Sequence, residues 1–521
     1  MLNEKRNGSR EQVGFYCMED LVPKDHILRK IEKAIDFSFI YDLVKDKYSE
    51  DMGRPSIDPV VLFKIVFIQY LFGIRSMRQT IKEIEVNAAY RWFLGYDWNE
   101  PIPHFTTFGK NYTRRFEGTD IFEKIFSRVL LEAVKLNYVD PKAVFIDSTH
   151  IKASANRNKK MKVQVQAEAQ HYHKELMDEI NKDRETHGKK PFDDDGPGKG
   201  GEAGQTKEVE KSTTDPECGM FHKGEHEKCF AYTAHTACDR HNFILGVELS
   251  PANVHDSVMF KSIYDKVKTA FPEIKYVVAD AGYKIPYICK QILDDHRVPV
   301  LPYKRPMSKE GYFKPYEYIY DEYYDCILCP NNQILHYSTT NRDGYREYKS
   351  NPEICAHCPK REQCTQSKSC QKTVIRHVWA DYLDIAEDFR YTPQGKAIYR
   401  ERAETSERVF ADAKEKHGLR YTTLRGKAKV TMQALLTFAC MNLKKLAIWK
   451  SRDPRFRPKS GFSISFSLNL FSTGRSLLKA ALGTLSQTPL CLQSGAWVSP
   501  TLFFCAGLPK KTIGAFRREV F

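Results

Sequence analysis

A short run of β-branched and aromatic residues that closes on an acid constrains the fold of this chain more than any other feature. The run Val144-Phe-Ile-Asp147 predicts a buried strand whose last carboxylate stands where the strand meets solvent. Ser148, Thr149 and His150 follow directly and are candidates to support that acid, although strand-end hydroxyls more often cap backbone groups. Most single aspartates in such a position only satisfy loop amides, so further acids are needed to indicate a site.

Two later stretches supply such acids. Ile274-Lys-Tyr-Val-Val-Ala-Asp280 is another apolar run that closes on an acid, and Gly282 allows a tight turn just after it. A long helical pattern from about Lys396 to Gly418 then carries Glu407. Two strand-end aspartates and a helical glutamate can jointly hold two hard divalent cations, which suits phosphodiester chemistry.

Other polar residues share the helical pattern of Glu407. Lys414 follows Glu407 by two turns along one face, and Tyr399 and Arg402 precede it on roughly the same side. Glu404 is the competing acid, but no lysine lies seven residues after it and it is off the Lys414 face. Glu407 is therefore preferred as the third acid.

These three stretches resemble those of the bacterial insertion-sequence DDE transposases. The matching pieces are Phe-Ile-Asp-Ser-Thr around Asp147, Val-Ala-Asp-Ala-Gly-Tyr around Asp280, and a tyrosine-arginine-glutamate-lysine signature. The signature continues into Gly418-Leu-Arg-Tyr-Thr-Thr-Leu-Arg-Gly426. It has four residues, rather than the usual three, between Arg402 and Glu407.

The resemblance covers most of residues 15–450 and implies cleavage and strand transfer at the terminal inverted repeats of an insertion sequence. The implied partners are double-stranded DNA with those repeats, target DNA, and a second copy of the chain in a homodimeric synaptic complex. The implied groups are two Mg²⁺ or Mn²⁺ ions held by Asp147, Asp280 and Glu407, with Tyr399, Arg402 and Lys414 positioning phosphates.

Two other functions stay open. A stand-alone metal-dependent DNA endonuclease would use the same acids without needing repeats or joining ends. An inactive sequence-specific DNA-binding protein would tolerate the loss of any acid.

The first 140 residues show helical patterns with few strand signals. Asp58 caps a predicted helix through Leu71, and Ser76 starts another that runs toward Trp92. These segments predict an all-α domain of the helix-turn-helix kind.

A third helix in this region is expected to be capped by Thr106 or Thr107. It carries Lys110 and Arg114 on one face with Arg115 beside them, and such a face would contact DNA phosphates or enter the major groove. Basic faces are usually only solvated, but the transposase resemblance extends over this region and indicates DNA contact.

The middle of the chain alternates strand patterns with helical ones and predicts a mixed sheet with helices on both faces. His255 and Asp256 are candidates for a further ligand, although helix capping accounts for them better. A charged stretch over 159–184 predicts a helix inside an exposed insertion, residues 157–212. The strands are expected over 144–146, 228–236, 243–249, 276–279 and 298–301, with a helix over 260–271 and an apolar helix over 430–446 that packs on the sheet.

Two Cys-x2-Cys pairs lie between that sheet and Glu407. Each pair can present two thiolates to one ion, so the pattern predicts a structural tetrahedral Zn²⁺ site. The alternative is a set of free buried thiols. Four of five cysteines are expected to bind the ion, and Cys364 is able to replace Cys326, the five being Cys326, Cys329, Cys355, Cys358 and Cys364.

Charge and hydropathy complete the expectation. The net charge of +15 favours a polyanionic partner, and basic residues outnumber acids after residue 451. The polar start of the chain lacks an export signal, and the longest apolar stretch, residues 60–74, is too short to span a bilayer. We therefore expect a cytoplasmic bacterial protein associated with the nucleoid and with no membrane.

The predicted fold class is an RNase H-like mixed sheet with flanking helices, preceded by an all-α helix-turn-helix-like domain and interrupted by a zinc-ribbon-like insertion. The final segment, residues 451–521, is either a flexible basic arm or sequence translated beyond the usual end of such a gene. The expected domains are residues 1–140 (DNA binding), 141–304 (first part of the catalytic domain), 305–395 (cysteine-rich insertion), 396–450 (last catalytic helices) and 451–521 (basic tail).

Overall fold

A mixed six-stranded sheet holds the predicted strands together. The computed structural model describes residues 14–49, 56–166, 172–192, 206–223, 227–305 and 309–456. The strands of this sheet are β1 (Ala143–Lys152), β4 (Gly219–Lys223), β5 (Glu227–Asp239), β6 (Ile244–Pro251), β7 (Tyr276–Val278) and β8 (Val298–Val300).

The central strand of this sheet is β1. It pairs antiparallel with β5 along almost its whole length, and parallel with β7 over Ala143–Phe145 only. The order is β4-β5-β1-β7-β8, and β6 also pairs with β5. The predicted mixed sheet and its hairpin are therefore confirmed.

Helices cover both faces of the sheet. The helix after β6, α10 (Asp256–Ala270), packs on β5 and β6, and α11 (Pro286–Asp294) packs on β8. On the other face, α16 (Ser406–Glu415) packs against β1. The chain reaches α16 through α14 (Ala380–Tyr391), α15 (Pro393–Arg400) and the 3-10 turn η6 (Glu401–Glu404).

The N-terminal region is helical, as expected. The Asp58 carboxylate accepts the Val60 amide and starts α4, which ends at Leu71 as predicted. The second expected helix is broken, because Asn87 caps a new helix after Val86. The helices are α1 (Met18–Leu21), α2 (Ile27–Ala34), α3 (Phe39–Val44), α4 (Pro59–Leu71), α5 (Met77–Val86), α6 (Ala88–Leu94), α7 (Thr106–Asn111) and α8 (Ile121–Lys135).

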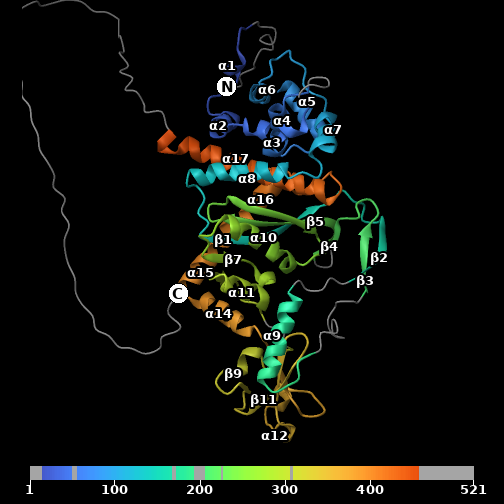
Figure 1. Ribbon diagram of the computed structural model, residues 1–521, viewed down its shortest axis with the longest axis vertical. Coiled ribbons are helices and arrows are strands. Elements are labelled where there is room, and N and C mark those ends of the chain that lie inside the picture. Colours follow the sequence, from blue (N-terminus) through green and yellow to red (C-terminus); the bar gives the residue numbers. More distant parts are fainter. Residues whose placement is uncertain are drawn as a thin grey trace, which may run out of the picture. The chain divides into compact units, whose positions relative to one another are not determined.

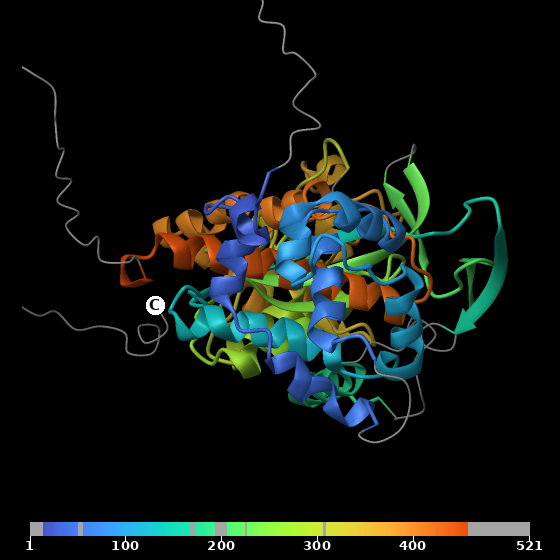
Figure 2. The ribbon, with the colours of Figure 1, turned by 90° about the horizontal axis from the view of Figure 1, so that it is seen from above.

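One long helix joins this region to the sheet. The helix α17 (Lys427–Arg452) contacts α2, α4 and α8 as well as β6, and both views show it beside α8 (Figures 1 and 2). The Asn442 amide bonds both backbone groups of Ile244 on β6. The predicted apolar helix is confirmed, but it packs on the N-terminal helices more than on the sheet. A single hydrophobic core results.

The segment 157–212 differs from the expectation. Residues 160–166 form β2 (Lys160–Gln166), which pairs with β3 (Thr206–Ser212), so the predicted helix is wrong there. Among the residues of this segment that the structure describes, a helix forms only over α9 (His173–Thr186). It buries Leu176 and Ile180, so this part of the insertion belongs to the folded body.

The cysteine-rich insertion contains a separate five-stranded antiparallel sheet of order β13-β12-β11-β10-β9. A small core of its own lies around Leu335 and Tyr348. Its elements are β9 (Ile319–Asp321), β10 (Cys326–Leu328), β11 (Ile334–Thr340), β12 (Tyr345–Lys349), β13 (Thr373–His377), α12 (Pro352–Ala356) and α13 (Arg361–Cys364).

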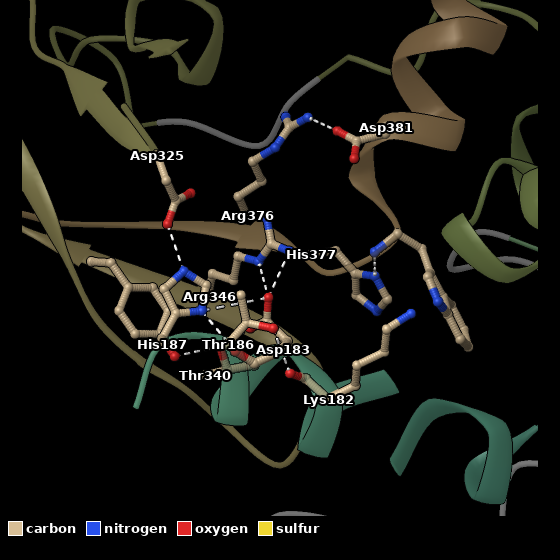
Figure 3. Close-up of polar contacts among 12 residues, drawn as sticks. Lys182, Asp183, Thr186, His187, Asp325, Thr340, Arg346, Arg376, His377 and Asp381 are labelled. Atoms are coloured by element: carbon tan, nitrogen blue, oxygen red, sulfur yellow. Dashed lines mark hydrogen bonds and ion pairs between the residues drawn. The ribbon is translucent and has the colours of Figure 1, made fainter. Parts of the chain in front are cut away.

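A buried polar network ties the two insertions together. The Asp183 carboxylate on α9 accepts hydrogen bonds from the Thr340 hydroxyl (2.5 Å) and from Nε of Arg346 (2.7 Å). One turn later, Nε2 of His187 lies 2.7 Å from the Asp325 carboxylate. Figure 3 shows Asp183 and His187, at the end of α9, facing Thr340, Arg346 and Asp325 of the cysteine-rich insertion. The network therefore fastens α9 to the cysteine-rich insertion.

Residues up to Phe456 form one compact unit, and the rest of the predicted basic tail lies outside the described residues. Among the described helices, none is both long and apolar enough to cross a membrane.

Candidate active site

Asp147 lies in the middle of β1 rather than at its end. The strand continues to Lys152, and Asp147 is only 7% exposed, so the expected strand-end position is wrong. The neighbouring strand β7 is the one that ends here, at Val278, while β1 continues. Asp147 is therefore buried on the side of β5 but has an open edge on the side of β7.

Asp280 lies two residues after the end of β7. The parallel pairing ends at Phe145 and Val278, two residues before each aspartate, and Asp280 is close enough to Asp147 to raise the pKa of its carboxyl. The Asp280 carboxylate accepts the Gly282 amide at 2.8 Å and caps the turn η4 (Ala281–Tyr283). A Cβ on Gly282 would lie 3.1 Å from that carboxylate, so the glycine permits this close approach.

Glu407, the third predicted acid, is linked to Asp147 through Arg402. The expected continuous helix is wrong, because it breaks into α15, η6 and α16 around Thr405. The break directs Arg402 toward β1, where its Nη2 lies 2.6 Å from Oδ2 of Asp147. Its Nη1 lies 3.4 Å from Oε1 of Glu407. Arg402 therefore joins the first and third acids.

The electrostatics of the site follow from this contact. Burial raises the pKa of Asp147, the Arg402 guanidinium lowers it, and Asp280 is close enough to raise it. The Glu407 side chain is 61% exposed, so it reaches the site from the solvent side. Burial raises the pKa of Tyr399, whose hydroxyl also senses Arg402 and Asp280.

The fit of these acids to a divalent cation is partial. In the described ranges no three His, Cys, Asp or Glu side chains converge as a metal-binding group. The donor pair Asp147 and Asp280 does suit a hard cation. Glu407 is separated from this pair by Arg402.

Four of the five candidate cysteines line one small pocket, namely Cys329, Cys355, Cys358 and Cys364. The backbone amides of Asn331 and Gln333 each donate to the Cys329 sulfur at 3.4 Å. Burial raises the pKa of the Cys364 thiol, and Cys329 and Cys355 are close enough to raise it further. Cys326 is buried on β10 opposite His336 and does not line the pocket.

Comparison with known families decides what kind of protein this is. A model described as a transposase domain (DUF772) matches residues 16–114, and one described as a transposase DDE domain matches residues 328–447. The chain is a transposase with these two domains. The first match spans α1 to α7 of the transposase, and the second runs from the end of β10 into α17. No curated protein matches the chain.

The predicted basic face of the transposase lies inside the first matched segment. Neither Thr106 nor Thr107 caps α7, because the helix begins after Phe105 without a side-chain cap. Lys110 and Arg114 are exposed. Arg115 instead donates to the Asn111 side chain, and its guanidinium carbon lies 4.4 Å from the centre of the Tyr48 ring. Its side chain is therefore engaged in contacts within the protein. The list of DNA-facing candidates here shortens to Lys110 and Arg114.

Sequence reasoning missed two side chains near the acids. His235 lies opposite Ser148 in the β1–β5 register, and Tyr283 lies in the turn after Asp280. Tyr283 ends the Val-Ala-Asp-Ala-Gly-Tyr stretch but was given no role there, and only the strand register could have indicated His235.

Proposed function

We propose that this transposase cleaves DNA at the terminal inverted repeats of an insertion sequence and transfers the cut strand to target DNA. The family implies transposition; the chemistry and the residues are our proposal. The observation that carries it is the placement of Asp147 and Asp280 two residues beyond the paired part of the neighbouring parallel strands β1 and β7, with Arg402 joining Asp147 to Glu407.

Asp147, Asp280 and Glu407 are the residues that would hold two Mg²⁺ or Mn²⁺ ions. Such ions, when bound, supply activation of the attacking oxygen and stabilisation of the leaving oxygen. The contact of Arg402 with Glu407 supports this acid over Glu404 as the third one.

The remaining signature residues act on the DNA backbone. Arg402 offers a planar fork that suits two phosphate oxygens, and Lys414 offers a point charge two turns after Glu407. In the first step a water oxygen bonds to phosphorus, the P–O3′ bond breaks, and the 3′ oxygen leaves with a proton. In the second step that 3′-hydroxyl attacks a target phosphodiester and displaces its 3′ oxygen.

The strand order supports an RNase H-like catalytic domain. Three antiparallel strands, β6-β5-β1, are followed by the parallel strands β7 and β8. We propose the domain boundaries given by the sequence, with residues 305–395 as a zinc-ribbon-like insertion.

Within that insertion we assign the zinc ligands as Cys329, Cys355, Cys358 and Cys364. Their shared pocket and the amide bonds to the Cys329 sulfur support this set, because a structural Zn²⁺ ion takes four tetrahedral ligands and four thiolates are one such set. A structural ion would hold α12 and α13 against β10 and β11.

The proposed partners are double-stranded DNA with terminal repeats and target DNA, bound by a homodimer that pairs two ends. The net charge of +15 and the exposed Lys110 and Arg114 support contact with phosphates.

The test is Mg²⁺-dependent cleavage and joining of a labelled DNA end that carries the repeat flanking the gene. Asp147→Ala, Asp280→Ala and Glu407→Gln are expected to lower both steps by at least about a thousandfold, and Glu404→Gln serves as the matched control. Activity that survives in Glu407→Gln but not in Glu404→Gln contradicts the third assignment. Cutting without any need for repeats or joining favours the endonuclease, and binding without cutting in Mg²⁺ or Mn²⁺ favours the inactive DNA-binding protein.

A further inference from the structure

The helix α5 has one buried side and one side that faces solvent. Its buried residues are Thr80, Ile81 and Ile84, and it packs on α4 and α6. At 3.6 residues per turn, these three side chains fall within about 100° of one another around the helix axis. The neighbouring helix α4 buries nine of its thirteen residues, so of these two helices α5 is the one with a face for a partner.

The solvent-facing side of α5 carries a row of basic and polar side chains. Its members are all exposed, namely Arg78, Gln79, Lys82 and Val86. They also fall within about 100° of one another, opposite the buried side. Val86, which ends the row, is 75% exposed. Two cations, an amide and a pair of methyl groups match what DNA offers, because its phosphates are negative and its base edges present acceptors, donors and the thymine methyl.

The amide in this row is held by a neighbouring acid. Nε2 of Gln79 donates a hydrogen bond to the Glu83 carboxylate, one turn later, at 3.0 Å. A side-chain amide has two N–H donors and a carbonyl acceptor, so Gln79 keeps one donor and the acceptor for a partner. That pair matches the N7 acceptor and the N6 donor that adenine presents in the major groove. The contact with Glu83 therefore orients Gln79 without using up its capacity to read a base.

An arginine links α5 to the predicted basic face of α7. The guanidinium carbon of Arg78 lies 4.4 Å from the centre of the ring of Phe105, the residue just before α7. Lys110 near the end of α7 and Arg114 in the turn after it are exposed. The contact holds the start of α7 against α5, so the two helices contribute cations to one region of the surface.

We propose that α5 is the helix that reads the terminal repeat, with its exposed side in the major groove and Gln79, oriented by Glu83, on an adenine. An α-helix with its side chains is about 10–12 Å across, and the major groove is about 12 Å wide. In this arrangement Lys82 contacts a phosphate, and the basic face of α7 contacts the backbone beside the groove. The inference rests on the proposed function, because it names the element that gives that function its sequence preference.

The test is equilibrium binding of the full chain, in EDTA, to a labelled duplex that carries the repeat flanking the gene and to a shuffled duplex of the same composition. Gln79→Ala is expected to lower the preference for the repeat about 5–100-fold and to leave the affinity for the shuffled duplex unchanged. Lys82→Ala is expected to weaken binding of both duplexes alike and to lower the salt slope by about one. Lys124→Ala is the matched control, because Lys124 lies exposed on α8 and pairs with Asp120.

Replacing single adenines of the repeat with 7-deazaadenine, which lacks N7, locates the contact. At one position this replacement is expected to weaken binding of the wild type but not of Gln79→Ala. A preference for the repeat that persists undiminished in Gln79→Ala overturns the inference, and its loss in Lys110→Ala instead would move base reading to α7. A wild-type chain that binds both duplexes equally contradicts the proposed function itself.

Discussion

At the scale of single residues, Arg402 is the side chain on which the active-site geometry depends most. Its guanidinium is 17% exposed and the Asp147 side chain 10% exposed, so the pair is mostly buried. Removing one partner of such a pair leaves the other as an uncompensated buried charge.

We therefore expect Arg402→Ala to lower the free energy of unfolding by about 3 kcal/mol. The measurement is urea unfolding in EDTA, so that no divalent cation replaces the arginine. Arg400→Ala is the control, since Arg400 is exposed. Equal stabilities of the two variants would show that Asp147 does not need this partner.

A buried histidine makes stability depend on pH. His417 is 4% exposed, its Nδ1 lies 2.8 Å from the Tyr70 carbonyl, and burial lowers its pKa to about 4. The unfolded chain takes up a proton near pH 6.5 while the folded chain does not, so stability falls as pH drops from about 6.5 toward 4.

Replacing His417 with glutamine is expected to reduce this slope by up to about 1.4 kcal/mol per pH unit. The measurement is the free energy of unfolding at several values between pH 7 and 5. His222→Gln, at an exposed position, should keep the wild-type slope. A slope unchanged in His417→Gln contradicts the assignment.

At the scale of elements, the turns after α4 and α16 touch through Gly73 and Gly418. Gly73 has φ +64°, and a Cβ there would lie 2.8 Å from the Lys416 carbonyl oxygen. Gly95 also has a positive φ, +78°, but a Cβ there would meet nothing within 4 Å.

The two alanine variants therefore separate backbone strain from close contact. Gly95→Ala should cost about 1 kcal/mol of stability, and Gly73→Ala about 1–3 kcal/mol more. Thermal or chemical unfolding of both variants measures the difference. Equal losses would mean that α4 and α16 do not approach as closely as the structure shows.

The cysteine-rich insertion offers a second test between elements. Cys364→Ser should remove bound zinc from the purified chain, whereas Cys326→Ser should retain one equivalent. Of these two cysteines, Cys364 lines the pocket and Cys326 does not. Zinc content by elemental analysis gives the answer. Retention in both variants, or loss in both, would reject the proposed ligand set.

At the scale of the whole molecule, residues up to Phe456 form one compact unit, and many of the remaining charged residues are basic. Deleting residues 457–521 is expected to leave the unfolding midpoint within about 2 °C and to flatten the salt dependence of DNA binding, because each lost phosphate contact lowers that slope by about one. The checks are thermal unfolding and binding at several salt concentrations. A midpoint lowered by more than about 5 °C would mean that the deleted residues stabilise the compact unit.

The sequence by itself determined the elements whose signals are local. The apolar runs before Asp147 and Asp280 and the Asp58 cap of α4 depend on neighbours within a few residues, and the structure has these elements, although β1 continues past Asp147 to Lys152. Expectations about α9 and about the helix before Glu407 were only partly correct, because charged composition does not reveal a strand pairing or a break.

Only the tertiary structure decided which side chains meet. The contact of Arg402 with Asp147, the approach of Asp256 to His235 and the network of Asp183 join residues far apart in the chain. Such contacts arise from strand register and helix packing, which no short stretch of sequence encodes. The local sequence therefore determined the strands and helices, and long-range packing assembled the site from them.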